Sequence, residues 1–140
     1  TALLEELRLS ALISAAPTAL VWLVFWFWGD ALLGLFGGSF TSMHSVLMIL
    51  AAAQVVNAFT GVAGSLLMMS GHEASHAKLS LSAAIAAACL IPIAGIIWGV
   101  LGVAWATFIV TCGYEVLLCR LALARTGFDG SVLAWRGALA

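Results

Sequence analysis

Long runs of apolar residues alternate with short polar or charged stretches along this chain. No Asp, Glu, Lys or Arg occurs between residues 9 and 28, and a second apolar run fits residues 46–69. About 20 residues in a helix rise about 30 Å, which is the thickness of the hydrocarbon core of a bilayer. The pattern therefore predicts membrane-spanning helices at about 9–28 and 46–69.

The next charge-free stretch, residues 79–114, is too long for one crossing of a membrane. As a single helix it would extend about 54 Å, well beyond the apolar core of a bilayer. Gly95, Gly99 and Gly102 fall in its middle, where glycines favour a turn. We therefore expect two more helices, at about 79–97 and 101–118, and a polar cytoplasmic tail over about 122–140.

These runs favour helices over the strands of a membrane barrel. Barrel strands alternate apolar and polar residues, whereas these runs are continuously apolar and rich in Ala and Leu. Helices also satisfy their own backbone groups inside lipid. The predicted fold is an all-α membrane protein, with four transmembrane helices in a single transmembrane region over residues 1–140.

Two prolines lie inside predicted helices, Pro17 in the first and Pro92 in the third. Each removes one backbone hydrogen bond and favours a bend. Such bends occur in ordinary membrane packing and also in the bendable helices of transporters, so Pro17 and Pro92 are candidate helix hinges.

The composition agrees with a membrane location and excludes several other classes of protein. The chain has 140 residues, of which 64% are hydrophobic and 8% are charged. Soluble domains carry about 25% charged residues, and disordered chains combine low hydrophobicity with high charge. The net charge of −1 gives no electrostatic basis for binding nucleic acid. Membrane lipids are therefore expected partners, and nucleic acid is not.

The distribution of basic residues predicts the orientation of the chain. Four crossings would place the N-terminus, the 70–78 connection and the C-terminal tail on one side of the membrane. That side would hold all five basic residues, which are Arg8, Lys78, Arg120, Arg125 and Arg136. Because basic loops stay in the cytoplasm, we expect both termini to be cytoplasmic. Four tryptophans would form an aromatic belt near the opposite interface, and they are Trp26, Trp28, Trp98 and Trp105.

Residues 72–76 read HEASH, which matches the H-E-x-x-H pattern of zinc proteases. In such an enzyme, His72 and His76 would bind zinc one helical turn apart, and Glu73 would be the general base. A third ligand is also needed, and only Asp129, in the polar tail, is a candidate. Because the motif falls in a predicted short connection between spans, we favour a solvated loop. We therefore expect no enzymatic activity, no metal site and no cofactor.

Glu115 is the only acidic residue well inside a predicted span. A charge at the bilayer centre costs about 2.5–3.5 kcal/mol, so this side chain should face protein or water. It would serve either as a proton or ion carboxylate in a transport path, or as a structural residue near the cytoplasmic third of the span that snorkels to the interface or pairs with Arg120.

A polar and small-residue face runs along the second predicted helix. Its members recur at spacings of three and four residues, and they are Gln54, Asn57, Gly61, Gly64 and Met68. Small residues allow close helix packing and amides form hydrogen bonds between helices, but the same face could line a substrate cavity. Gln54 and Asn57 are therefore transport-path candidates beside Glu115.

Four segments resemble a known family by their order and spacing. They are GDALLGLFG at 29–37, LLMMSGHE at 66–73, IP at 91–92 and GVLGVAWAT at 99–107. This succession resembles the C-terminal part of oligosaccharide and polysaccharide (O-antigen type) flippases of the multidrug/oligosaccharidyl-lipid/polysaccharide exporter superfamily. The resemblance covers about residues 9–133 and corresponds to the last four helices of the second of two lobes, so we expect the chain to be a fragment of a larger two-lobe transporter.

The resemblance implies a function in the bacterial cytoplasmic (inner) membrane. Such proteins move a lipid-linked oligosaccharide across the membrane for cell-surface polysaccharide and lipopolysaccharide synthesis, by alternating access between two lobes. The expected partners are this substrate, membrane lipids and the remaining helices of the full-length transporter. Cavities of these flippases are usually cationic, but no Lys or Arg lies deep in any predicted span here.

Three alternatives remain open at the level of sequence. One is a small four-helix membrane protein that acts by oligomerising, without transport. A multidrug/cation antiporter of the same superfamily usually keeps acidic residues within its spans, and this chain offers Glu115. A membrane zinc protease would depend on the HEASH segment.

Overall fold

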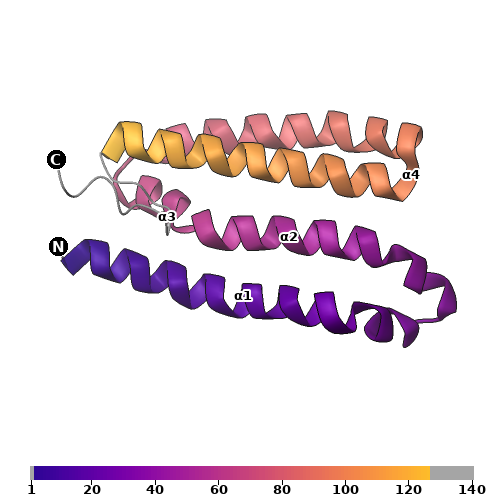
Figure 1. The fold of residues 1–140 in the computed structure, drawn as a ribbon. Coiled ribbons are helices and arrows are strands. Elements are labelled where there is room, and N and C mark those ends of the chain that lie inside the picture. The colour runs from indigo at the N-terminus through magenta and orange to yellow at the C-terminus, as the bar shows by residue number, and fades with distance from the viewer. Residues whose placement is uncertain (1, 127–140) are drawn as a thin grey trace.

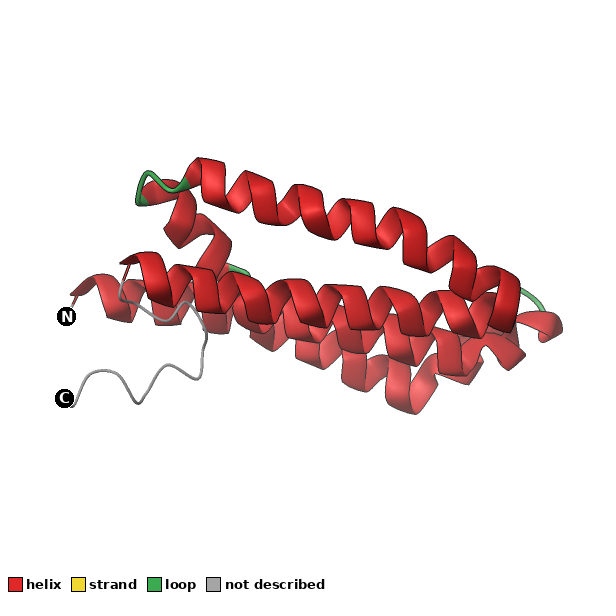
Figure 2. Cartoon of the chain, turned by 90° about the horizontal axis from the view of Figure 1, so that it is seen from above, coloured by secondary structure: helices red, strands yellow, loops and turns green. Residues whose placement is uncertain are grey.

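The computed structural model of the chain describes residues 2–126, and in that part the chain is helical. Its elements in order are α1 (Ala2–Gly34), a short 3-10 helix η1 (Gly38–Met43), α2 (His44–Thr60), α3 (Val62–Met69) and α4 (Glu73–Thr126). Figure 2 shows helices and loops and no strand in the described residues. The prediction of an all-helical chain is confirmed.

Within residues 2–126, three helical segments are long and apolar enough to cross a membrane. They are Leu12–Gly34, His44–Met69 and the 54-residue Glu73–Thr126. Little of each segment is buried inside the bundle, although its side chains are apolar. An apolar helix that is not covered by protein requires lipid around it. The chain therefore has the architecture of a multi-pass membrane protein.

Helix α4 reverses direction at Gly99, within the turn predicted from the sequence. Gly99 has φ 64° and ψ −151°, a backbone conformation that is essentially restricted to glycine. The arm before it (73–98) and the arm after it (100–126) lie side by side in Figure 1. A side chain at Gly102 would overlap the carbonyl oxygen of Ala94 and lie 2.8 Å from Cβ of Trp98. Gly99 thus makes the turn, and Gly102 lets the arms approach.

The helix boundaries differ from the predicted ones, most clearly in α4. The helix begins at Glu73 instead of residue 79, and it continues to Thr126 instead of ending at 118. Its last turns are held by packing, because Leu118 and Ala122 are buried against Ala63 and Leu67 of α3. Residues 122–126 of the predicted tail are therefore helical, and 127–140 lie outside the described residues.

The first two predicted spans also differ in detail. α1 extends beyond 9–28 at both ends, and the span predicted at 46–69 is divided at Gly61 into α2 and α3. Pro17 lies inside α1 and Pro92 inside α4, and both helices continue through the proline. The hinge role of the two prolines stays a prediction.

The packing core of the bundle is made mostly of small residues. α2 packs against α1 on one side and α4 on the other, and α3 packs against α4. The buried hydrophobic residues are Ala15, Ala53, Ala63, Leu66, Leu67, Ala94, Ala104, Leu118 and Ala122. Large apolar side chains point outward, as in Ile96, which is 86% exposed. Small residues between helices and large ones toward lipid are typical of membrane bundles.

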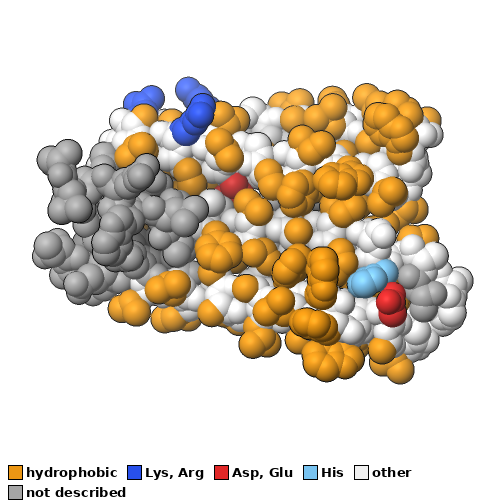
Figure 3. Space-filling view, viewed as in Figure 1, with side chains coloured by type: hydrophobic (Ala, Val, Ile, Leu, Met, Phe, Trp, Pro, Cys, Tyr) orange, Lys and Arg blue, Asp and Glu red, His pale blue; other side chains and the backbone are white. Residues whose placement is uncertain are grey.

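Apart from the buried Glu115, the charged side chains that the structure describes lie at the two ends of the bundle. Lys78, Arg120 and Arg125 are exposed near the beginning and end of α4, which lie at the same end of the molecule (Figures 1 and 3). α1 also begins at this end, and Asp30 and His44 lie at the opposite one. Arg136 lies outside the described residues. The separation of charge expected for a membrane-spanning bundle is therefore present among the residues described.

Candidate functional site

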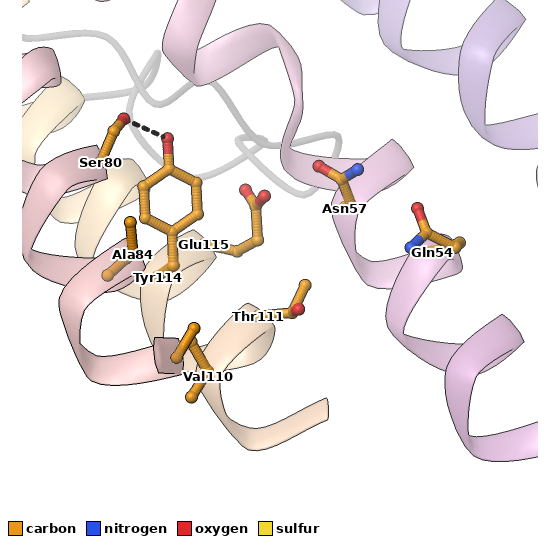
Figure 4. Close-up of a pocket in the computed structure, with 10 residues that line it drawn as sticks. Gln54, Asn57, Ser80, Ala84, Val110, Thr111, Tyr114 and Glu115 are labelled. Atoms are coloured by element: carbon orange, nitrogen blue, oxygen red, sulfur yellow. Dashed lines mark hydrogen bonds between the residues drawn. The ribbon is translucent and has the colours of Figure 1, made fainter. Parts of the chain in front are cut away.

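A polar cavity opens between α2 and the two arms of α4. Its volume is about 370 Å³. It is lined by Gln54 and Asn57 of α2, by Ser80, Ala83, Ala84 and Ala87 of the first arm, and by Val110, Thr111, Tyr114 and Glu115 of the second arm. Figure 4 shows these side chains converging from three helical segments. The structure therefore brings together the three residues that the sequence singled out as transport-path candidates, which are Gln54, Asn57 and Glu115.

Glu115 is the buried acidic group of this cavity. The residue is 3% exposed, and its Oε2 lies 2.5 Å from the hydroxyl of Thr60, which is the last residue of α2. The same hydroxyl lies 2.9 Å from the carbonyl oxygen of Val56. This pair of contacts fixes the carboxyl group of α4 to the C-terminal end of α2.

The structural alternative for Glu115, a pair with Arg120, is not what the structure shows. Arg120 is exposed, and within residues 2–126 the contact found for the Glu115 carboxyl is with Thr60. Among the described residues, no Lys or Arg lines the cavity. Within that part of the chain the carboxyl group is held by a neutral hydroxyl, and no cation of the cavity wall balances its charge.

Gln54 and Asn57 contribute the amide wall of the cavity. Both side chains are exposed and stand on α2 across from Glu115 and Thr111 (Figure 4). The predicted face does not continue unchanged, because α2 ends at Thr60. Beyond that break Gly64 is buried against His76 and Leu118, and Met68 is 52% exposed.

A second polar group extends from the cavity toward the basic end of the bundle. The hydroxyl of Tyr114 lies 3.1 Å from Oγ of Ser80 and 3.3 Å from Nε2 of His76. Tyr114 is on the second arm of α4, while Ser80 and His76 are on the first arm one turn apart. These contacts connect the two arms, and they place a half-buried histidine behind the cavity.

The HEASH segment is differently placed from the loop that we predicted. Glu73 to His76 form the first turn of α4, and His72 directly precedes it, with its carbonyl oxygen accepting the backbone N–H groups of Ser75 and His76. The helix starts early because this carbonyl takes the capping position. Among residues 2–126, no group of three or more His, Cys, Asp and Glu residues is arranged to hold a metal ion. Asp129, the proposed third ligand, lies outside the described residues.

A histidine at the opposite end of the bundle links α1 to α2. Nδ1 of His44 lies 3.2 Å from Oδ1 of Asp30, and Nε2 lies 3.2 Å from the carbonyl oxygen of Phe25. The ring sits on Gly29, where a Cβ atom would come within 2.7 Å of Nε2. This contact closes the α1–α2 pair at the end that holds Asp30.

Sequence reasoning missed Thr60, Ser80 and Tyr114. Thr60 lies three residues after Asn57, so the helical spacing that identified the polar face of α2 also includes it. Ser80 and Tyr114 are polar residues inside apolar runs, and Tyr114 directly precedes Glu115. Their pairing depends on how the two arms of α4 align, and a sequence pattern does not specify that register.

The chemistry of the cavity is that of hydroxyl, amide and carboxyl groups inside an apolar bundle. Such groups exchange hydrogen bonds with a hydroxyl-rich molecule, and a carboxyl group binds a proton or another cation. They do not provide the basic contacts that a pyrophosphate requires. Comparison of the chain with protein-family models, with curated proteins and with solved structures finds no match.

Proposed function

We propose that the chain is the C-terminal four-crossing part of a bacterial inner-membrane transporter that flips lipid-linked oligosaccharide. In this proposal α1, the α2–α3 pair and each arm of α4 cross the membrane, and both termini are cytoplasmic. The crossings belong to one lobe of a larger two-lobe protein that works by alternating access. The sequence resemblance supplies the substrate class, and the basic end of the bundle supports the orientation.

The observation that carries the transport function in this proposal is the cavity around Glu115. A carboxyl group buried among apolar helices is costly, and such groups in membrane proteins usually mark substrate or ion pathways. Here it stands beside two amide side chains and a cavity of about 370 Å³. Glu115 would bind a proton or a cation when the cavity faces one side of the membrane and release it on the other.

The amide wall suits the sugar part of the proposed substrate. Gln54 and Asn57 offer both donors and acceptors, which is what sugar hydroxyl groups require. The lining that residues 2–126 provide lacks the basic contacts needed by the pyrophosphate. In this proposal those contacts come from the remaining helices of the full-length transporter.

A multidrug/cation antiporter is the second candidate, and a specific observation favours it. The part of the cavity wall that the structure describes contains a carboxyl group and no Lys or Arg. That arrangement would attract a cationic drug more readily than an anionic lipid.

A flux assay separates the two candidates. The native gene product, carrying this segment, would be reconstituted in vesicles and offered either a polyprenyl-pyrophosphate-linked oligosaccharide or the lipophilic cation ethidium. The flippase proposal predicts transport of the oligosaccharide, with a loss in Asn57→Ala and Glu115→Ala. Ile109→Ala is the control, because Ile109 is 63% exposed on the bundle surface. Transport of ethidium alone would establish the antiporter instead, and transport of neither would overturn both.

A further inference from the structure

We propose that His76, Tyr114 and Ser80 form a proton path between the basic end of the bundle and the cavity of Glu115. The inference rests on the proposed transport function, in which Glu115 exchanges a proton or a cation. It goes further by naming the ion as a proton and by naming the side chains that deliver it.

The three side chains lie in a series of contacts between the loop end of α4 and the cavity wall. His76 lies in the first turn of α4, close to the loop that joins it to α3. Its Nε2 is 3.3 Å from the hydroxyl of Tyr114, which is 3.1 Å from Oγ of Ser80. Ser80 and Tyr114 line the cavity together with Glu115, as Figure 4 shows. The chain of contacts therefore begins near the loop and ends at the cavity wall.

Imidazole and hydroxyl groups can pass a proton along hydrogen bonds. A neutral imidazole has one nitrogen that donates and one that accepts, and each hydroxyl group can do both. A proton received at one end of such a chain is passed on as each hydrogen bond reverses, and no member keeps a charge. The cavity is large enough for several water molecules at about 30 Å³ each, so water can complete the connection from Ser80 and Tyr114 to Glu115.

The groups around His76 determine what its ring contacts. Its ring faces Tyr114 on the second arm, and Nε2 would lie 3.2 Å from a Cβ atom at Gly64 of α3. α3 contains no Asp, Glu, Lys, Arg or His. In α2 the residue of these types is His44, which lies at the first position of that helix, at the opposite end of the bundle from His76. On its own arm the nearest titratable side chains in sequence are Glu73 and Lys78, both exposed, and His72 directly precedes the helix. The contact found for its ring nitrogens within the described residues is therefore the Tyr114 hydroxyl.

A purely structural role would be to hold the two arms of α4 together. Both roles predict some loss of stability when a hydroxyl is removed. They differ in the rate of proton transfer, because a structural contact does not control how quickly Glu115 gains a proton.

Time-resolved infrared spectroscopy of the full chain in detergent tests this difference without requiring transport. A flash-released proton would protonate Glu115, and its carboxyl C=O band is identified by its absence in Glu115→Gln. We expect Tyr114→Phe and Ser80→Ala to slow the appearance of this band by roughly tenfold or more, equivalent to a rise in barrier of about 1.4 kcal/mol, with the final amplitude unchanged. Ser82→Ala is the matched control, because the Ser82 hydroxyl is exposed and bonds to the carbonyl oxygen of Leu79 on its own arm.

Each outcome decides the proposal. A slower band in the two path variants, with Ser82→Ala at the wild-type rate, supports it, and restoration of the rate in His76→Ala by added imidazole would support it further. Equal rates in all variants would overturn the path while leaving the transport function to the flux assay. A Glu115 band that never appears would overturn proton delivery to this residue, although flux of oligosaccharide could still be present.

Discussion

The contact between Thr60 and Glu115 gives the sharpest test of how α2 is fixed to α4. Thr60→Val replaces the hydroxyl by a methyl group of similar size and leaves the buried carboxyl group without its partner 2.5 Å away. We expect the free energy of unfolding to fall by about 0.6–1.7 kcal/mol, which runs from the average to the largest value measured for hydrogen bonds between helices inside membranes. This loss is smaller than or at the low end of the roughly 1–3 kcal/mol of a buried polar group left unpaired in a soluble protein, because the unfolded state in a membrane also finds partners.

A double-mutant cycle isolates this contact from other effects of the substitution. Thr60→Val, Glu115→Leu and the double variant would be unfolded by increasing denaturing detergent and followed by tryptophan fluorescence. Thr107→Val is the matched control, because the Thr107 hydroxyl bonds to the carbonyl oxygen of Val103 within its own helix. We expect a coupling of about 0.6–1.7 kcal/mol between Thr60 and Glu115. Additivity within about 0.3–0.5 kcal/mol would refute the reasoning.

Two further predictions concern close contacts between helices. Gly102→Ala should destabilise the protein by about 1–3 kcal/mol, because the new Cβ would overlap the opposite arm of α4. Gly113 has open space around it, so Gly113→Ala should be neutral or stabilising by up to about 1 kcal/mol. Thermal unfolding of the two variants tests this difference, and equal effects would contradict the hairpin geometry. Gly29→Ala should destabilise by about 0.5–1.5 kcal/mol, because it displaces the His44 ring from its hydrogen bonds. In a His44→Ala background, Gly29→Ala should not lower the free energy of unfolding in this way. The same loss in both backgrounds would show that the His44 ring does not pack against Gly29.

The elements of the fold were predictable because the bilayer imposes a length on apolar helices. Runs free of charge indicated where helices lie, and the glycines near residue 99 indicated the reversal of α4. The helix ends were less predictable, because packing decided them. Ala122 extends α4 beyond the predicted end through its burial against α3, an effect that depends on a neighbour far away in sequence.

The candidate site was predictable in part. Glu115 stood out because an acidic residue inside an apolar run is costly, and Gln54 and Asn57 stood out by helical spacing. Their convergence in one cavity depends on how α2 and α4 align, and the sequence does not determine that alignment. A pair with Arg120, one or two turns along the same helix, was one of the alternatives for Glu115, but the structure provides Thr60 on another helix.

Water access to the cavity wall tests the central claim, that a polar path lies inside this apolar bundle. Single cysteines would be placed at Ala84, which lines the cavity, and at the neighbouring Ile85, which is 57% exposed on the bundle surface. The background would lack the native Cys89, Cys112 and Cys119. A membrane-impermeant maleimide reacts with the thiolate, which forms in contact with water and not with lipid. The account predicts labelling at position 84 and none at 85 in intact membranes, and equal labelling at both positions, or labelling at 85 alone, would contradict it.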